Sequence, residues 1–460
     1  MTVAADIALR LIEVIGAKRV IAAAEELATY AVDGALPHAI ARPASVEEAA
    51  EVVRLAISEK LRVLPLGSRS KCDLGMAPER YDIALDMTGL RGIAHFDAGD
   101  LTLSVESGTP LRELEIYLKR HGQFLPLAVP CFESATAGGT IASGIDSALR
   151  MQYGSARDFL IGAEFIDGTG QLCKSGGRVV KNVTGYDLHK LLIGSLGTLG
   201  VITRVNFKTF PLPHTFGGHL ASFAACGAAL EYRRATETAG LPLANQEILD
   251  PNVAEIIRAI RRRAEEASAL ELGPAEWYVY SAFEGRTEVV ERIGRDLEKI
   301  ARATGAAQNR VLEAAEDQAL GGMLRECFEW LRWTSPANVI LRLALAEIRS
   351  ATLAGLSRVG NAVALRPALL IRAAGIVYFS ALAENDDEEA MELLAETVSK
   401  VRSIALAAKG HATLLHAPAA VKKRVGKAML AETEIAMQQR VKQAFDHSGI
   451  FAPGRVVGGI

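Results

Sequence analysis

Small residues are concentrated in three segments of the chain, and these segments hold the residues best suited to chemistry. The first segment is PLGSRSK at 65–71. Its first two residues end an apolar run, Leu61–Leu66, and the rest follow that run. A strand that enters a turn of Gly and Ser can direct several backbone N–H groups at a phosphate, because little side-chain bulk blocks the approach. The turn lacks the GxGxxG spacing of a dinucleotide-binding fingerprint and the GxxxxGKS/T of a P-loop, so an ordinary strand-to-loop turn is the alternative explanation.

The second and third segments extend this pattern. ESATAGGTIASG, residues 133–144, draws six of its twelve residues from Gly and Ala. Such a stretch cannot build a core, but it lets the backbone lie flat against a large planar ligand and its pyrophosphate; a flexible surface loop is the alternative. In the third segment, GGRVVKNVTGYDLHKLLIGSLGTLGVIT at 176–203, the glycines of GSLGTLG recur at three-residue spacing and permit a ligand edge to pack against the backbone.

The elements that must position these segments follow from helix and strand signals. Ser45 followed by Glu48 is a capping box that opens a helix, and Pro110 suits the start of another. The sequence DGTG at 167–170 predicts a tight turn between two strands. We therefore expect helices at Val46–Glu59, Leu111–His121 and Tyr186–Ile193, a loop over 130–158, and strands at Leu61–Leu66, Ile83–Met87, Leu101–Glu106, Phe159–Ile166, Gln171–Ser175 and Thr198–Phe210.

The composition changes after about residue 215. Helix-favouring Ala, Glu, Arg and Leu dominate from there to 440, interrupted by strand candidates at Trp277–Phe283, Asn338–Leu345 and Gly375–Leu382. This alternation predicts a helix-covered sheet that forms a further domain. We expect an α+β fold in four parts: an N-terminal helical segment at 1–37, a two-subdomain ligand-binding domain at 38–214, an α+β cap or substrate domain at 215–440, and a C-terminal segment at 441–460 that returns to the ligand-binding domain.

Charge and cysteine content exclude several classes of protein. Lys and Arg number 51 against 54 Asp and Glu, and the basic clusters at Arg258–Arg263 and Lys422–Lys427 lie in helical patterns, so nucleic-acid binding is not expected. The five cysteines are widely spaced and form no CxxC pair, which argues against a disulfide framework, a metal site or an iron–sulfur cluster on this chain. No stretch is long and apolar enough to span a bilayer, and we expect a cytoplasmic protein.

Taken in order, the three segments resemble the FAD-binding domain of the vanillyl-alcohol oxidase / p-cresol methylhydroxylase (PCMH) flavoproteins. In that family the turn corresponding to PLGSRSK and the loop corresponding to ATAGG cradle the pyrophosphate of FAD, while the segments corresponding to GSARD at 154–158 and GTLGVIT at 197–203 line the flavin and adenosine. The resemblance implies a PCMH-type domain at 38–214, with FAD between two subdomains and an α+β cap over the isoalloxazine. It implies FAD contacts from Pro65, Leu66, Gly67, Ser68, Arg69, Ser70, Lys71, Pro130, Ala135, Thr136, Ala137, Gly138, Gly139, Ala142, Gly144, Gly154, Ser155, Arg157, Asp158, Tyr186, Gly194, Gly197, Gly200, Val201, Ile202 and Arg455.

The resemblance also bears on how FAD is attached. Members of the family with covalent flavin usually hold a His in the first turn, or a His or Cys in the later one. Here the turn reads GSRSK, with Cys72 just beyond it, so we expect noncovalent FAD. Cys131, near the second segment, is the remaining candidate for a tether; a buried small hydrophobe is the alternative.

Within this family the chain resembles the smaller FAD-binding subunit of bacterial glycolate oxidase. RVVKNVTGYDLHKLLIGSLGTLGVIT at 178–203, GHATLLHAP at 410–418 and FAPGR at 451–455 carry the likeness, which is looser over 215–400. It implies oxidation of a small 2-hydroxyacid such as glycolate or lactate. It also implies a larger FAD subunit and a separate iron–sulfur partner that receives the electrons, in a complex that can reach the inner face of the membrane.

Two other functions stay open at this point. The larger 2-hydroxyacid dehydrogenases carry an HxGDGNxH metal signature and an EHG motif, and neither occurs in this chain. Their absence in part favours a non-catalytic subunit that holds FAD for a larger partner. A stand-alone FAD-dependent alcohol- or aldonolactone-type oxidase would share the fold but would function without partners.

Oxidation of an alcohol next to a carboxylate needs a base for the hydroxyl proton and a cation for the carboxylate. Imidazole titrates near the working pH, so the histidines of GHATLLHAP are base candidates: His411 is our catalytic assignment, and His416 is the second candidate. A surface histidine, or one satisfied in the core, is the alternative for each. The candidate partners for the substrate carboxylate are Arg178, Lys181 and Arg455; ordinary surface charge is the alternative for each. Tyr186 and Asp187 are candidates for the border of the flavin, and the start of a helix is the alternative explanation for both.

Overall fold

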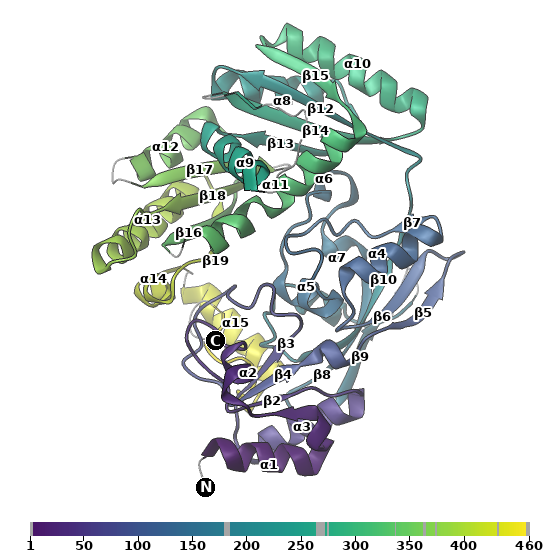
Figure 1. The fold of residues 1–460 in the computed structure, drawn as a ribbon, viewed down its shortest axis with the longest axis vertical. Coiled ribbons are helices and arrows are strands. Elements are labelled where there is room, and N and C mark those ends of the chain that lie inside the picture. Colours follow the sequence, from purple (N-terminus) through teal and green to yellow (C-terminus); the bar gives the residue numbers. More distant parts are fainter. Residues whose placement is uncertain are drawn as a thin grey trace.

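The chain folds into two lobes, one built from both ends of the sequence and the other from its middle (Figure 1). The computed structural model describes residues 3–178, 185–263, 272–273, 276–335, 337–361, 365–372, 375–429 and 432–456. Helices and strands alternate in both lobes, which confirms the α+β class. None of the described helices is both long and apolar enough to cross a membrane.

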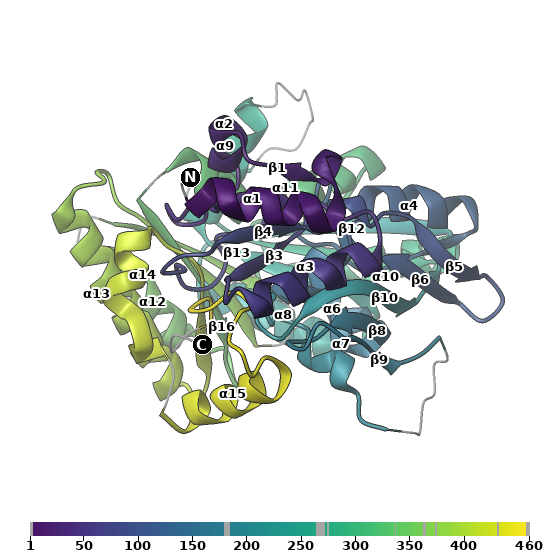
Figure 2. The same cartoon turned by 90° about the horizontal axis from the view of Figure 1, so that it is seen from below.

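The first subdomain is a four-stranded sheet covered by helices. Strands β2, β4 and β3 are parallel and β1 is antiparallel at the edge. Half of the predicted capping box forms: Ser45 Oγ accepts from the Glu48 N–H at 3.1 Å, but the Glu48 carboxylate accepts from the N–H of Ala44, one residue before the cap, at 2.7 Å. Helices α1 and α3 lie side by side beneath the sheet (Figure 2). The elements are α1 (Val3–Ile15), η1 (Ala17–Arg19), β1 (Val20–Ile21), α2 (Ala24–Ala28), β2 (Ala39–Ala41), α3 (Val46–Ser58), β3 (Val63–Leu66), β4 (Ile83–Asp86) and η2 (Met87–Gly89).

The second subdomain is a five-stranded antiparallel sheet in the order β5-β6-β10-β8-β9. The predicted hairpin around DGTG is confirmed by β8 and β9. The loop expected over 130–158 was wrong in part, because Thr136 Oγ1 accepts from the Gly139 N–H and caps a short helix of small residues. The elements are β5 (Ile93–Asp97), β6 (Thr102–Glu106), α4 (Leu111–Arg120), β7 (Gln123–Phe124), α5 (Ala137–Ser143), α6 (Arg150–Tyr153), α7 (Ala156–Phe159), β8 (Leu160–Ile166), β9 (Leu172–Gly176), η3 (Leu188–Leu191), β10 (Val201–Lys208) and β11 (Phe210–Pro211).

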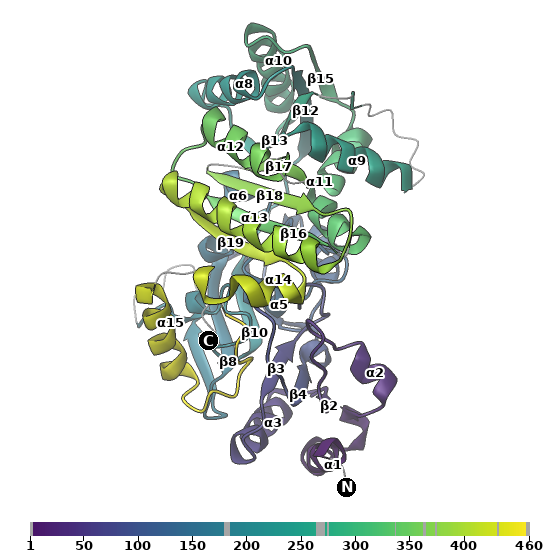
Figure 3. The same ribbon diagram turned by 90° about the vertical axis from the view of Figure 1, so that its left-hand side faces the viewer.

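The middle of the chain forms an eight-stranded antiparallel sheet, which we call the cap sheet, in the order β15-β12-β14-β13-β17-β18-β16-β19. Helices α8, α10, α12 and α13 pack on one face, and α9 and α11 on the other, so that a hydrophobic core lies on each side (Figure 3). The elements are β12 (Thr215–Phe223), α8 (Cys226–Thr238), β13 (Leu243–Leu249), α9 (Pro251–Arg263), β14 (Trp277–Gly285), α10 (Thr287–Ala303), β15 (Gln308–Leu312), α11 (Ala314–Thr334), β16 (Asn338–Ala344), α12 (Ser350–Asn361), β17 (Arg366–Arg372), β18 (Ile376–Leu382), α13 (Glu388–Ala407), β19 (His411–His416), α14 (Ala419–Val425) and η4 (Gly426–Met429).

The chain then returns to the first lobe. Helix α15 (Glu432–Phe445) packs there, with the ring of Phe445 against that of Phe165. Beyond it, Phe451 is fully buried and forms a parallel bridge with Val63 of β3, flanked by hydrogen bonds from the Val63 N–H to Ile450 O and from the Ala452 N–H to Val63 O. The C-terminal residues therefore extend the sheet that carries the first small-residue turn.

Candidate functional site

The three small-residue segments meet at one cleft in the first lobe. The turn after β3 faces helix α5 across a solvent-open cleft with about 520 Å³ of empty space, and an adjoining cleft with about 350 Å³ continues toward the start of β10. The predicted residues that line these two cavities are Pro65, Leu66, Gly67, Ser68, Arg69, Ser70, Lys71, Thr136, Gly138, Gly139, Ala142, Gly197, Gly200, Ile202 and Arg455.

Glycine is required where the segments touch. A Cβ on Gly67 would overlap the hydroxyl oxygen of Thr136 and lie 3.3 Å from its Cβ. A Cβ on Gly138 would lie 2.6 Å from the Cβ of Ser107. No side chain fits at either position without displacing its neighbour, so one wall of the cleft is bare backbone.

The turn also presents hydrogen-bond donors without partners. Among the described residues, no acceptor bonds the backbone N–H groups of 68–71. Lys71 is buried, its Nζ has only the Ser70 hydroxyl at 3.5 Å, and burial lowers the pKa of its ammonium group. Glu329 and Glu326 offset part of the charge of Lys71, and the free N–H groups beside it still favour an anion. The pyrophosphate of FAD has the chemistry that such a turn binds. The residues present therefore fit the cofactor.

Helix α5 contributes shape more than donors. The Ala137 N–H donates to Thr109 O at 2.9 Å and the Gly138 N–H to Ser107 O at 2.8 Å, so both groups are already used. Free donors for a pyrophosphate would therefore come from the first turn, and α5 would supply the opposing wall.

The remaining predicted FAD residues line neither of these cavities. Gly144 and Gly194 pack backbone against backbone, and the side chain of Asp158 accepts from the Ser155 N–H as the cap of α7. The side chain of Tyr186 is 89% exposed. FAD contacts stay a prediction for Pro130, Ala135, Ala137, Gly144, Gly154, Ser155, Arg157, Asp158, Tyr186, Gly194 and Val201.

Arg455 holds the loop that follows the turn. Its buried guanidinium donates to the carbonyl oxygens of Cys72, Leu74 and Met76 and lies 3.6 Å from the carboxylate of Asp33. These bonds occupy both terminal nitrogens, while the buried Nε has no hydrogen-bond partner among the described residues. Arg455 therefore shapes the cleft, and its role as an anion partner stays a prediction. Of the other candidates, Arg178 is exposed beside a separate cavity on the five-stranded sheet, and Lys181 lies outside the described residues.

Neither candidate thiol is activated for a covalent tether. Burial raises the pKa of Cys131 to about 12, with a further contribution from Glu329, and burial also raises the pKa of Cys72. A thiol with a raised pKa is protonated near neutral pH and is a weak nucleophile. Noncovalent FAD stays our prediction.

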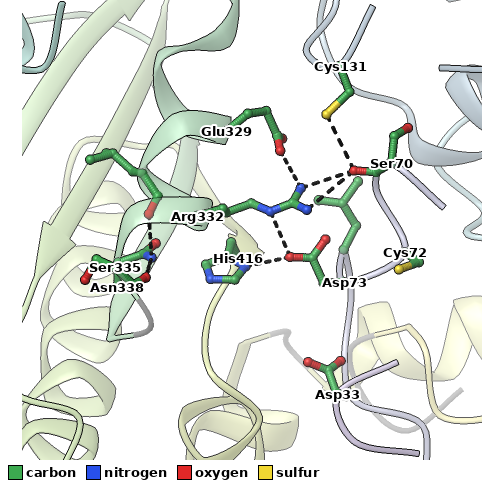
Figure 4. A network of polar contacts seen from close by, with 12 residues as sticks. Asp33, Ser70, Cys72, Asp73, Cys131, Glu329, Arg332, Ser335, Asn338 and His416 are labelled. Carbon is green, nitrogen blue, oxygen red and sulfur yellow. Dashed lines mark hydrogen bonds and ion pairs between the residues drawn. The ribbon is translucent and has the colours of Figure 1, made fainter. Parts of the chain in front are cut away.

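A polar network joins the turn to the middle lobe (Figure 4). His416 Nδ1 lies 2.7 Å from Asp73 Oδ2, and Arg332 Nε lies 3.0 Å from the same oxygen. Arg332 also pairs with Glu329 at 2.7 Å and donates to Ser70 O at 3.4 Å. Turn, α11 and β19 thus converge at one end of the cleft.

This network orients the ring of His416. Burial raises the pKa of Asp73, but the hydrogen bond from His416 and the charge of Arg332 outweigh it and hold the pKa at about 2. Nδ1 faces this carboxylate, so the ring presents Nε2 away from Asp73. By contrast, His411 is exposed at the opposite end of β19. The geometry favours His416 over His411 as the base.

Three residues of this network were missed by the sequence reasoning. Asp73 follows the turn without a motif of its own, and Glu329 and Arg332 lie in the loosely matched middle of the chain. Their spacing along α11 is that of any helical Glu and Arg pair, so only the fold reveals that they face Asp73.

We expect Asp73→Asn to change how stability depends on pH. A carboxylate whose pKa is lowered from 3.8 to about 2 stabilises the fold above pH 4 and loses that contribution as the pH falls toward 2. The contribution is about 2 kcal/mol. Urea unfolding between pH 4.5 and 2.5 should show a shallower loss of stability in the variant than in the wild type; parallel curves would contradict the assignment.

Comparison with known proteins agrees with this geometry. Residues 37–176 match the FAD binding domain family, and residues 218–341 and 374–456 match the C-terminal domain of FAD linked oxidases. In fold, the chain is similar to p-cresol methylhydroxylase with substrate bound, at a TM-score of 0.78 and 16% identity over 98% of this chain and 96% of that one.

Two curated relatives give more detail. Glycolate oxidase subunit GlcE of Escherichia coli (strain K12) is 42% identical over 164 residues, which are 35% of this chain and 46% of that protein, so the match spans less than half of the relative. Glycolate oxidase subunit GlcD of Bacillus subtilis (strain 168) is 24% identical over 92% of this chain and 89% of its own length. With both domain families matched in order over well over half of its residues, the chain belongs to the FAD-linked oxidases.

Proposed function

We propose that this FAD-dependent oxidoreductase is a cytoplasmic FAD-binding subunit that oxidises a 2-hydroxyacid, glycolate and lactate being the simplest. The observation that carries the proposal is the His416–Asp73 pair, which lies 2.7 Å apart beside the turn that fits FAD. The likeness to glycolate oxidase subunits supports the substrate class and a complex with a larger FAD subunit.

Each group of the site has a role in this reaction. The backbone amides of 68–71 and the side chain of Lys71 would hold FAD, and the bound FAD would accept two electrons from the alcohol. His416 Nε2 would take the hydroxyl proton, and Asp73 would orient the ring and stabilise the imidazolium. Arg332, with its side chain only 10% exposed, is held by the carboxylates of Asp73 and Glu329 and by Ser70 O, so it fixes Asp73 beside the ring of His416.

Electrons must then leave the chain. No group of three His, Cys, Asp or Glu that could hold a metal occurs among the described residues, and the five cysteines are dispersed in the sequence. We therefore infer a separate iron–sulfur partner as acceptor. The absence of the HxGDGNxH and EHG motifs supports one other candidate function, a subunit that holds FAD while a larger partner oxidises the substrate.

The visible spectrum of the purified chain tests the proposal. We expect flavin bands near ~450 nm that bleach when glycolate or lactate is added anaerobically. Bands that persist after every 2-hydroxyacid tried would favour the FAD-holding subunit. A chain that binds no FAD, alone or with its partners, would contradict both functions.

A further inference from the structure

The loop 72–76, which follows the FAD turn, is held by two buried cations from the C-terminal part of the chain. Arg455 and Lys422 of α14 are 3% and 1% exposed. Together they donate to four carbonyl oxygens of the loop, those of Cys72, Asp73, Leu74 and Met76. The loop lies outside the helices and strands, so these two side chains supply donors that regular structure does not.

The carboxylate of Asp33 contacts both cations. Lys422 Nζ lies 2.9 Å from each of its oxygens, and Arg455 Nη1 lies 3.6 Å from one of them. The side chain of Asp33 is itself only 7% exposed. Burial lowers the pKa of Lys422 and of Arg455, and the charge of Asp33 is the largest influence that opposes it. Without this carboxylate, two buried positive charges would face one another uncompensated, which is costly.

A tight turn directs Asp33 toward the cations. The N–H of Val32 donates to Ala35 O and the N–H of Ala35 donates to Val32 O, both at 3.0 Å. Between them, Asp33 and Gly34 have φ values of 50° and 86°. Positive φ at both central residues is typical of a type I′ turn, which favours Asp-Gly and Asn-Gly. Asparagine at position 33 would therefore remove the charge and keep the turn.

The loop carries the residue that orients His416. The backbone oxygen of Asp73 accepts from Lys422 Nζ at 2.5 Å, and its side-chain Oδ2 lies 2.7 Å from Nδ1 of His416 (Figure 4). The same residue is thus fixed at its main chain by Lys422 and paired at its side chain with the imidazole. A shift of the loop would move the ring relative to the FAD cleft.

On these grounds, and resting on the function proposed above, we propose that Asp33 is a positioning residue for oxidation of the 2-hydroxyacid. It neutralises Lys422 and Arg455, the two cations hold the loop 72–76, and the loop sets Asp73 against His416. Asp33 does not line the FAD cleft, so its effect on the base is indirect. It also precedes residues 37–176, which match the FAD binding domain family, so the N-terminal segment takes part in building the site.

Reduction of bound FAD in the full chain tests this role. Asp33→Asn should lower the limiting rate with saturating glycolate or lactate at least ~10-fold, because a small misplacement of a catalytic group is enough for such a loss. The concentration that gives half of this rate should stay unchanged, since Asp33 holds the base and not the substrate. Glu25→Gln removes a carboxylate at an exposed position of the same segment and should keep the wild-type rate. Anaerobic stopped-flow absorbance measures all three chains.

A double-variant cycle separates positioning from a general loss of structure. If Asp33 acts through the base, Asp33→Asn should slow reduction in the wild-type background but not in the His416→Asn background, where the base is already absent. A purely structural defect would lower the rate by the same factor in both backgrounds. That outcome would overturn the proposed role.

A second variant serves if Asp33→Asn does not fold with FAD. Asp33→Asn combined with Lys422→Met removes one cation together with the carboxylate, so the net charge of the buried cluster is unchanged. It also lacks the hydrogen bond to Asp73 O. Reduction should again be slow, with no further slowing when His416→Asn is added.

The outcomes separate this inference from the proposed function. A wild-type rate in Asp33→Asn, or in the combined variant where that one is needed, would overturn the positioning role while 2-hydroxyacid oxidation stands. If no 2-hydroxyacid reduces the flavin of the wild-type chain, the proposed function fails and the role of Asp33 in it fails as well.

Discussion

Replacing His416 with asparagine is expected to slow reduction of bound FAD by a 2-hydroxyacid roughly 100- to 10,000-fold, the usual contribution of a positioned base. The asparagine amide can still donate to Asp73, as Nδ1 does now at 2.7 Å, so the network with Arg332 is preserved. Only the proton-accepting Nε2 is lost. Anaerobic stopped-flow absorbance of the flavin band measures the rate directly.

His411 supplies the matched control. It belongs to the same strand, is exposed, and lies at the opposite end from His416. His411→Asn should therefore reduce FAD at the wild-type rate. If the two variants are equally slow, or if His416→Asn keeps full activity, His416 is not the base. A normal flavin spectrum in both variants would show that each still binds FAD. A difference in rate between them would then reflect the reduction step and not loss of the cofactor.

The second large effect concerns the backbone wall of the cleft. Gly67→Ala should weaken FAD binding roughly 10- to 100-fold, because forcing a methyl group into a packed contact costs about 1–3 kcal/mol. The new Cβ would collide with the hydroxyl of Thr136, which also caps α5. The displacement would disturb both walls of the cleft at once. Equilibrium dialysis of FAD against the purified variant measures the loss.

Gly177→Ala is the control for this experiment. Gly177 belongs to the same domain, and a Cβ there would meet no atom within 4 Å. We expect its FAD affinity to equal that of the wild type. Wild-type affinity in Gly67→Ala would mean that Thr136 rotates away without consequence, and it would contradict the close approach of the two segments.

The FAD cleft could be predicted from the sequence because its determinants are local. Two sequence features indicate where the backbone can approach a ligand closely. These are a glycine that follows an apolar strand and a run of Ala and Gly. The same residue types also serve the fold. Ser155 and Asp158 cap α7, because helix caps and anion sites use the same side chains, so their residue types alone do not separate the two roles.

The polar network around His416 could not be predicted in full, because its members come from distant parts of the chain. Asp73 and His416 are 343 positions apart, and their pairing depends on how β19 joins the cap sheet. Several strands of that sheet were missed for a related reason. Every residue of β13 is buried, so the alternation of polar and apolar residues that indicates a strand is absent.

The return of the C-terminus to the first lobe dictates when the cofactor can be captured during synthesis. Phe451 pairs with β3 and Arg455 holds the loop after the FAD turn, yet both residues leave the ribosome after the whole cap sheet has been made. A nascent chain that has just been made as far as β11 still lacks Phe451 and Arg455. We therefore expect FAD to load only after residues 451–455 have been made, and we expect cleavage before Phe451 to weaken FAD binding while the cap sheet stays folded.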